Sequence, residues 1–132
     1  MDINLYVNGK KINPLYKKAI AEYIKRLSPY CSLSLVCAPG RIKFNSGKNN
    51  MNFVIGDTET ISSEEFARQI NDITTGGVSK INYYIGYPQE QTSGMNTFAI
   101  CSISPESDMT ALLLSEQIYR AYTILNNITY HK

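Results

Sequence analysis

Residues 51–86, MNFVIGDTETISSEEFARQINDITTGGVSKINYYIG, decide the fold class of this chain. Two apolar runs, 51–55 and 81–85, have the length of buried strands, and each ends at a glycine. Between them, Ser62 and Glu65 form the S-x-x-E pattern that caps the start of a helix, and Gly76-Gly77 ends it. This succession of strand, helix and strand is typical of an α/β protein.

The flanking sequence continues the alternation. It predicts strands at 3–7, 33–37 and about 97–103, a helix that Asn13-Pro14 opens and Ser28-Pro29 stops, and a long last helix from Ser104-Pro105-Glu106 to about Asn126. We therefore expect a mostly parallel sheet with helices on both faces, in a single domain spanning residues 1–132. The last helix is apolar on more than one side, which indicates a central position or an oligomer interface.

Composition restricts the class of protein. Hydrophobic residues make up 43% of the chain and charged residues 18%, an ordinary globular balance. No apolar run approaches the roughly 18 residues that a membrane span needs, and the first residues do not resemble a signal peptide. The three cysteines show no C-x-x-C spacing, so we expect buried free thiols, no metal site and a cytoplasmic location.

The net charge of +2 conceals an asymmetry along the chain. Residues 1–48 contain nine Lys/Arg and two Asp/Glu, whereas residues 49–132 contain four and nine. Much of the positive charge lies on the first helix, at Lys17, Lys18, Lys25 and Arg26. Such a division indicates a surface that faces a polyanion, and a merely solvated lysine-rich helix is the alternative.

Three strand ends are the places where a ligand would bind. In open α/β sheets, ligands bind beyond the carboxyl ends of the strands. The strand ends of this chain that could form such a site are residues 54–56, 85–87 and 100–105. The chain has neither G-x-G-x-x-G nor G-x-x-x-x-G-K-[ST], so a Rossmann dinucleotide site or a P-loop is disfavoured. It has one histidine, His131, which excludes any mechanism that needs two imidazoles.

Three segments resemble one known family. The segment LLLSEQIYRAYTILNNITYHK (112–132) is similar to the closing helix and tail of the RlmH-type methyltransferases, a SPOUT-class family that methylates a pseudouridine of large-subunit ribosomal RNA. In that family an E-Q-[LIV]-Y-R-A core precedes a terminal Y-H-[RK]. The segments YVNGKKINPLYKKAIAEYIKRLSPY (6–30) and ISSEEFARQI (61–70) resemble the family's opening strand and helix and its S-S-E-x-[FL]-A helix start.

The resemblance implies a SPOUT-type fold with a C-terminal trefoil knot, and a homodimer packed through the last helix. It also implies S-adenosylmethionine held by three loops that carry Val54, Gly86, and Ile100, Cys101, Ser102, Ile103, Ser104 and Pro105. The reaction would need no metal, because positioning does most of the work. Arg120, Tyr130 and His131 would contact the RNA or help to activate the base.

Several positions depart from the family pattern. Tyr87 replaces the second glycine of I-G-G, and a ring there would fill the cofactor pocket or close its entrance. The loop that usually reads S-K-M-T-x-P-H is Ser102-Ile103-Ser104-Pro105-Glu106-Ser107 here. The segments between the second and third strands, and between Gly86 and the last helix, are shorter than usual. The stretch 87–96 is expected to lack the family's small helix.

Three functions are compatible with these observations. The first is an active S-adenosylmethionine-dependent methyltransferase of ribosomal RNA. The second is a catalytically silent paralogue that keeps the dimeric fold to bind RNA or the ribosome. The third is a structural homodimer with no role in RNA binding.

Overall fold

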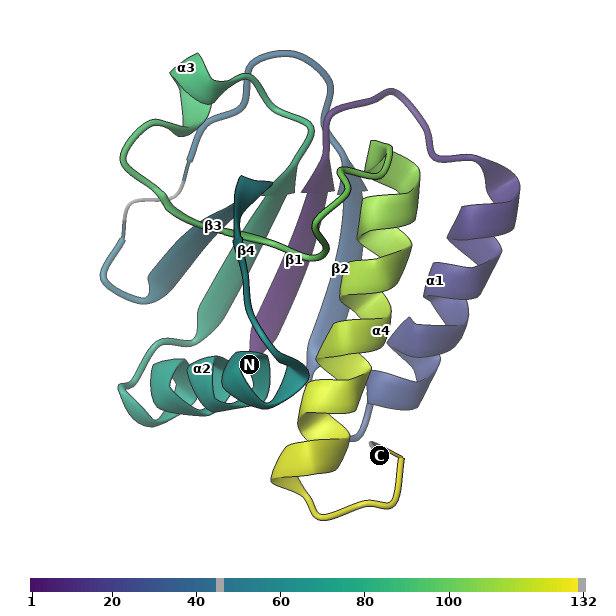
Figure 1. The fold of residues 1–132 in the computed structure, drawn as a ribbon, viewed down its shortest axis with the longest axis vertical. Helices are drawn as coiled ribbons and strands as arrows, with labels where there is room; N and C mark the ends of the chain where they lie inside the picture. Colours follow the sequence, from purple (N-terminus) through teal and green to yellow (C-terminus); the bar gives the residue numbers. More distant parts are fainter. Residues whose placement is uncertain (45–46, 131–132) are drawn as a thin grey trace.

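A computed structural model describes residues 1–44 and 47–130, except for the side chain of Asp57. The strands form one five-stranded parallel sheet in the order β2-β1-β4-β3-β5, which confirms the expected parallel sheet (Figure 1). The strands are β1 (Asp2–Val7), β2 (Ser32–Cys37), β3 (Asn50–Thr60), β4 (Lys80–Ile85) and β5 (Asn96–Ala99); the helices are α1 (Pro14–Leu27), α2 (Ser63–Thr75), α3 (Gln89–Thr92) and α4 (Ser107–Leu125).

The helix starts predicted from the sequence are confirmed. The Asn13 side chain accepts a hydrogen bond from the Leu15 amide at 2.9 Å, with Pro14 in the first turn, where no amide donor is needed. The Ser62 hydroxyl accepts one from the Glu65 amide at 3.1 Å, and α2 ends at Gly76. Local sequence alone fixes these ends, because the capping groups lie within a few residues of them.

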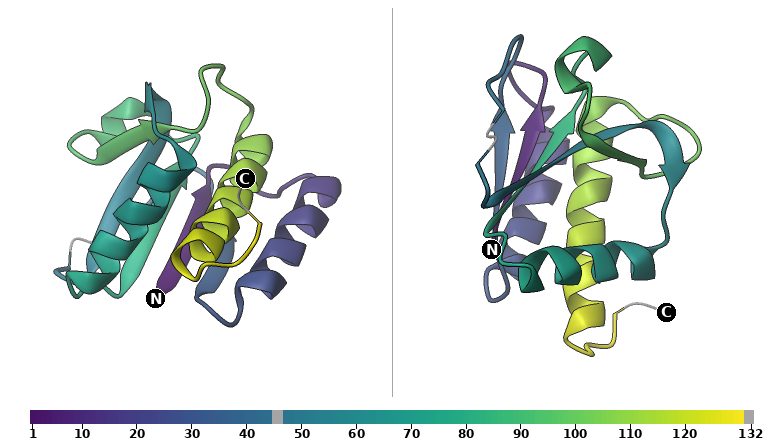
Figure 2. Two further views of the ribbon diagram at one scale, coloured as in Figure 1. Left: turned by 60° about the horizontal axis from the view of Figure 1, so that its bottom comes forward. Right: turned by 90° about the vertical axis from the view of Figure 1, so that its left-hand side faces the viewer.

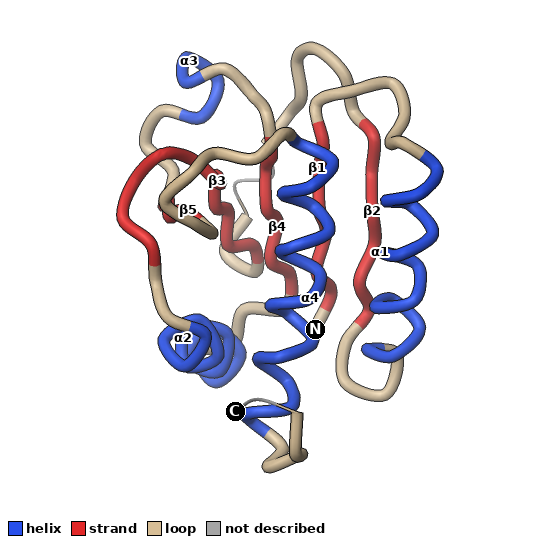
Figure 3. The backbone as a smooth tube through the Cα atoms, turned by 45° about the vertical axis from the view of Figure 1, so that its right-hand side comes forward, coloured by secondary structure: helices blue, strands red, loops and turns tan. Residues whose placement is uncertain are grey.

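The core lies between the sheet and the three long helices. Ile3, Leu5 and Val7 of β1 point into it and are at most 1% exposed. On β4, Tyr83 is fully buried, and its ring packs against Phe66 of α2. α4 runs through the middle of the helical layer, with α1 on one side and α2 on the other (Figures 1 and 3).

The expectation of helices on both faces is wrong for the residues that the structure describes. α1, α2 and α4 all lie on one face of the sheet, as the edge-on view of Figure 2 shows. The opposite face carries polar and aromatic side chains: Asn4 donates a hydrogen bond to Asn82 at 3.0 Å, and the rings of Tyr6 and Tyr84 stack at 5.0 Å. The chain between β2 and β3 crosses this face, where Phe44 meets the Tyr84 ring edge-on at 4.7 Å.

The strand order explains this one-sided arrangement. The steps from β1 to β2 and from β3 to β4 run in the same direction across the sheet, so right-handed crossovers place α1 and α2 on the same face. The steps from β2 to β3 and from β4 to β5 run the other way. Among the described residues, the first of these connections contains no helix and the second contains only the single turn α3, so no long helix covers the second face.

Three boundaries and one short helix differ from the predictions. β3 continues past Gly56 to Thr60 through a break in its pairing with β5. The stretch 87–96 contains one helical turn, α3, which the sequence was expected to lack. β5 ends at Ala99, and α4 begins at Ser107.

Two kinds of feature are absent from the described residues. None of the helices there is both long and apolar enough to cross a membrane. No group of three or more His, Cys, Asp or Glu side chains comes together there as a metal site would require.

The expectation of buried thiols is wrong for two of the three cysteines. Cys31 is buried, whereas Cys37 and Cys101 are exposed, because they lie at or beyond the ends of strands.

Candidate functional site

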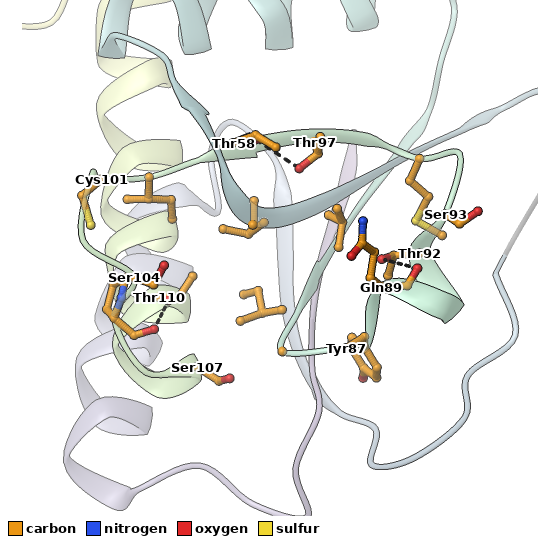
Figure 4. Close-up of a pocket in the computed structure, with 18 of the residues that line it drawn as sticks. Thr58, Tyr87, Gln89, Thr92, Ser93, Thr97, Cys101, Ser104, Ser107 and Thr110 are labelled. Atoms are coloured by element: carbon orange, nitrogen blue, oxygen red, sulfur yellow. Dashed lines mark hydrogen bonds between the residues drawn. The ribbon is translucent and has the colours of Figure 1, made fainter.

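A cavity of about 540 Å³ opens at the carboxyl edge of the sheet, where β3, β4 and β5 end (Figure 4). This volume lies within the range of small-molecule sites. The lining comes from the ends of the three strands, from α3 and its flanks, and from the loop and first residues of α4: Val54, Ile55, Gly56, Thr58, Ile85, Gly86, Tyr87, Gln89, Thr92, Ser93, Gly94, Met95, Thr97, Ile100, Cys101, Ser104, Pro105, Ser107 and Thr110.

Most of the expected cofactor residues line this cavity. They are Val54, Gly86, Ile100, Cys101, Ser104 and Pro105. The structure thus brings together all three strand-end loops selected from the sequence. Two neighbours in the last loop, Ser102 and Ile103, do not line the cavity, and Ile103 is 82% exposed.

Gly86 has a conformation and a neighbour that only glycine tolerates well. Its φ is +82°, and a Cβ placed there would lie 2.5 Å from the Ser107 hydroxyl oxygen. Its carbonyl accepts a hydrogen bond from the Asn8 side chain at 3.0 Å. The loop after β4 can therefore lie directly against the first turn of α4 and close that side of the cavity.

The Tyr87 ring forms part of the cavity wall and leaves the volume open. Its hydroxyl donates a hydrogen bond of 2.6 Å to the Ala38 carbonyl, and the ring meets Tyr84 edge-on at 6.0 Å. Burial raises the pKa of Tyr87 to about 12, so the phenol keeps its proton at neutral pH and remains a donor. Tyr87 thus attaches the cavity wall to the end of β2.

The cavity also contains polar side chains that sequence reasoning did not select. The Thr58 and Thr97 hydroxyl oxygens lie 3.3 Å apart, and Gln89, Ser93 and Thr110 line other parts of the wall. Thr58 reaches the site because β3 continues beyond Gly56. No local motif marks that continuation, since it depends on pairing with β5.

The expected catalytic residues form a separate cluster near the end of α4. Glu116 accepts hydrogen bonds from Arg120 and from the Tyr130 hydroxyl, the latter at 3.1 Å, and the Arg120 guanidinium lies 5.2 Å from the Tyr130 ring centre. The bond to Glu116 raises the pKa of Arg120. Burial and then the Glu116 charge raise the pKa of Tyr130 to about 12, so at neutral pH its hydroxyl can donate a proton.

Within one chain, this cluster does not reach the cavity. Thr110 is the last residue of α4 that lines the cavity, and Arg120 lies ten residues further along the helix, about 15 Å away at the helical rise of about 1.5 Å per residue. His131 lies outside the described residues.

Comparison with known proteins identifies the family. A family model described as "Predicted SPOUT methyltransferase" matches residues 48–131, more than half of the chain and the whole of the cavity lining. The chain belongs to the SPOUT methyltransferase family. Its cavity is formed at the carboxyl ends of three parallel strands.

Several curated SPOUT relatives align over their full length and over all of this chain. "Ribosomal RNA large subunit methyltransferase H" of Limosilactobacillus reuteri (strain DSM 20016) is 33% identical, and its namesake from Levilactobacillus brevis (strain ATCC 367) is also 33% identical. "Ribosomal RNA large subunit methyltransferase H 1" of Thermoanaerobacter sp. (strain X514) is 31% identical. The chain thus belongs to the large-subunit methyltransferase H branch of the family.

The relatives differ in length. The alignment with the L. reuteri protein runs over 160 positions, 28 more than the 132 residues of this chain, whereas the Thermoanaerobacter alignment runs over 135. This chain is therefore shorter than some of its relatives and close in length to others.

Proposed function

We propose that this protein transfers a methyl group from S-adenosylmethionine to a nucleobase of large-subunit ribosomal RNA in the cytoplasm, with pseudouridine as the target. The observation that carries the proposal is the cavity of about 540 Å³ at the carboxyl edge of the sheet, in a chain that aligns end to end with ribosomal RNA methyltransferases. The cofactor supplies an electrophilic methyl group on its sulfonium.

The cavity lining suits such a cofactor. Apolar side chains such as Val54, Ile55 and Ile100 offer contacts to a purine ring, and the Thr58 and Thr97 hydroxyls offer partners to ribose. The backbone around Gly86 can approach a ligand closely because no side chain intervenes. The protein's contribution is to hold the donor and the base in line and to exclude water.

We also infer a homodimer packed through α4, with the C-terminal knot of the SPOUT fold. Arg120 lies about 15 Å along α4 from the cavity of its own chain, and Tyr130 lies beyond it, so this pair can act there only if a second copy brings its own pair to it. Two partly exposed apolar residues of α4, Met109 and Leu113, stand outside the core cluster and offer a surface for that contact.

Calorimetric titration with S-adenosylmethionine, followed by methylation of large-subunit RNA, tests the proposed function. Cys101→Trp places a large ring on an exposed residue of the cavity wall, and we expect it to weaken cofactor affinity by at least about tenfold, or about 1.4 kcal/mol. Ser102→Trp is the matched control, because this neighbouring exposed residue does not line the cavity.

A folded wild-type protein that binds no S-adenosylmethionine would overturn the methyltransferase proposal. It would favour the silent paralogue. Equal losses of S-adenosylmethionine affinity in Cys101→Trp and Ser102→Trp would show instead that the cofactor binds somewhere other than this cavity.

A further inference from the structure

The loops that follow β1 and β2 carry four exposed cations at the same edge of the sheet as the cavity. Lys10 and Lys11 follow β1, and Arg41 and Lys43 follow β2. All strands of the sheet are parallel, so these loops leave the edge at which β3, β4 and β5 form the cavity (Figure 1). We call these four residues the edge cations.

Side-chain amides attach the two loops to each other and to the cavity wall. Asn8 accepts a hydrogen bond from the Gly40 amide at 3.1 Å and donates one to the Gly86 carbonyl at 3.0 Å. One polar side chain thus joins both cation-bearing loops to the glycine that borders the cavity.

A second amide holds the other end of the same segment. Gln91 of α3 donates to the Gly40 carbonyl at 3.2 Å and accepts from the Ile42 amide at 3.3 Å. Arg41 therefore lies between two anchored residues, and Lys43 follows directly. Tyr87 adds a third attachment through its bond to Ala38.

Acidic residues also lie at this edge. Glu90 is on α3 beside Gln91, so it lies close to the segment that carries Arg41. Glu106 and Asp108 lie at the start of α4, and Asp108 accepts a hydrogen bond from the Asn13 amide at 2.9 Å. The edge cations all lie on the two loops after β1 and β2, so a polyanion at the cavity is attracted mainly to these loops.

We propose that the edge cations bind the phosphates of the substrate RNA, and that Asn8 and Gln91 hold these cations in a fixed position relative to the cavity. This inference rests on the proposed function. It assigns RNA contact to the loops beside the cavity and not to the outer face of α1, whose Arg26 is already paired with Glu22. With the phosphates on the β1 and β2 side, the target base can enter the cavity.

The test compares two matched double variants by fluorescence anisotropy with a labelled RNA hairpin from large-subunit RNA, over a range of salt concentrations. Arg41→Ala/Lys43→Ala should weaken RNA binding by about tenfold at low salt. The plot of log affinity against log salt concentration should also become less steep, by about 0.7–0.9 for each phosphate that the protein no longer neutralises. Lys25→Ala/Lys48→Ala removes two exposed cations near the opposite edge, at the end of α1 and before β3, and should change neither quantity.

Gln91→Ala tests the positioning role separately. It removes no charge, so the salt slope should stay as in the wild type. Affinity for RNA should nevertheless fall several-fold, because the freed segment must be ordered again on binding. Asn8→Ala should act in the same direction.

Titration of each variant with S-adenosylmethionine separates this inference from the proposed function. Unchanged cofactor affinity with weakened RNA binding in Arg41→Ala/Lys43→Ala supports the inference. Equal weakening in both double variants, or weakening only in Lys25→Ala/Lys48→Ala, would overturn it and move the RNA contact elsewhere. A wild-type protein that binds RNA but not the cofactor would instead contradict the proposed function.

Discussion

At the scale of single residues, Gly86 is the position where the cavity depends most directly on one amino acid. Gly86→Ala adds a methyl group 2.5 Å from the Ser107 hydroxyl at a φ of +82°. The positive φ alone costs about 1–2 kcal/mol. The Ser107 hydroxyl must also turn away from the new methyl group, which adds a smaller cost because this oxygen ends a side chain that can rotate. We therefore expect a loss in the free energy of unfolding somewhat above the backbone cost, measured by urea denaturation, together with weaker cofactor binding.

Gly94 offers the matched control for this prediction. Its φ is +86°, but a Cβ there would meet nothing within 4 Å, so Gly94→Ala should show the backbone cost alone. In the double variant Gly86→Ala/Ser107→Ala, the loss in the free energy of unfolding should fall to that of Gly94→Ala. A double variant no more stable than Gly86→Ala would show that the Ser107 contact is not the cause.

At the scale of secondary-structure elements, α4 connects the two parts of the proposed site, with Ser107 at one end and the Glu116, Arg120 and Tyr130 cluster toward the other. Glu116→Gln removes the carboxylate that holds both partners. We expect faster hydrogen exchange at residues 127–130 and slower methyl transfer, with unchanged affinity for S-adenosylmethionine because the cavity is remote. The pKa of Tyr130 should fall from about 12, since the negative charge that helps to raise it is gone.

α1 contains a comparable ion pair that serves as the control. Glu22 and Arg26 are also four residues apart, but their side chains are 54% and 48% exposed, against 19% and 27% for Glu116 and Arg120. Glu22→Gln should therefore change stability by less than about 1 kcal/mol and leave methyl transfer intact. If Glu22→Gln and Glu116→Gln have the same effect on methyl transfer, the Glu116, Arg120 and Tyr130 cluster has no role of its own in the reaction.

At the scale of the whole molecule, the proposed dimer makes a prediction about oligomeric state. Leu113→Glu places a charge on the partly exposed side of α4, where a second copy would cover it, and should give monomers in light scattering and loss of methyl transfer. Leu15→Glu makes the same change at a leucine of α1 that is 78% exposed and should leave the dimer intact. A dimeric Leu113→Glu would contradict packing through this side of α4.

The elements themselves were largely predictable, because their determinants are local. Asn13-Pro14, Ser62 with Glu65, and Gly76 mark helix ends within a few residues of the groups they satisfy. The strands were recognisable as short apolar runs, and the strand-end glycines pointed to the edge where the cavity lies. α3 was missed because a single helical turn of polar residues has no periodicity to detect.

The sequence by itself determined the parallel α/β class, the family, and the three loops that line the cavity, since each depends on short motifs or on ordered similarity along the chain. Only the tertiary structure decided that the long helices share one face, because this follows from the strand order, which no local pattern encodes. It also decided that Thr58 enters the cavity and that Arg120 lies about 15 Å from it along α4. These facts depend on contacts between residues far apart in the chain, so their physical cause appears only once the chain is folded.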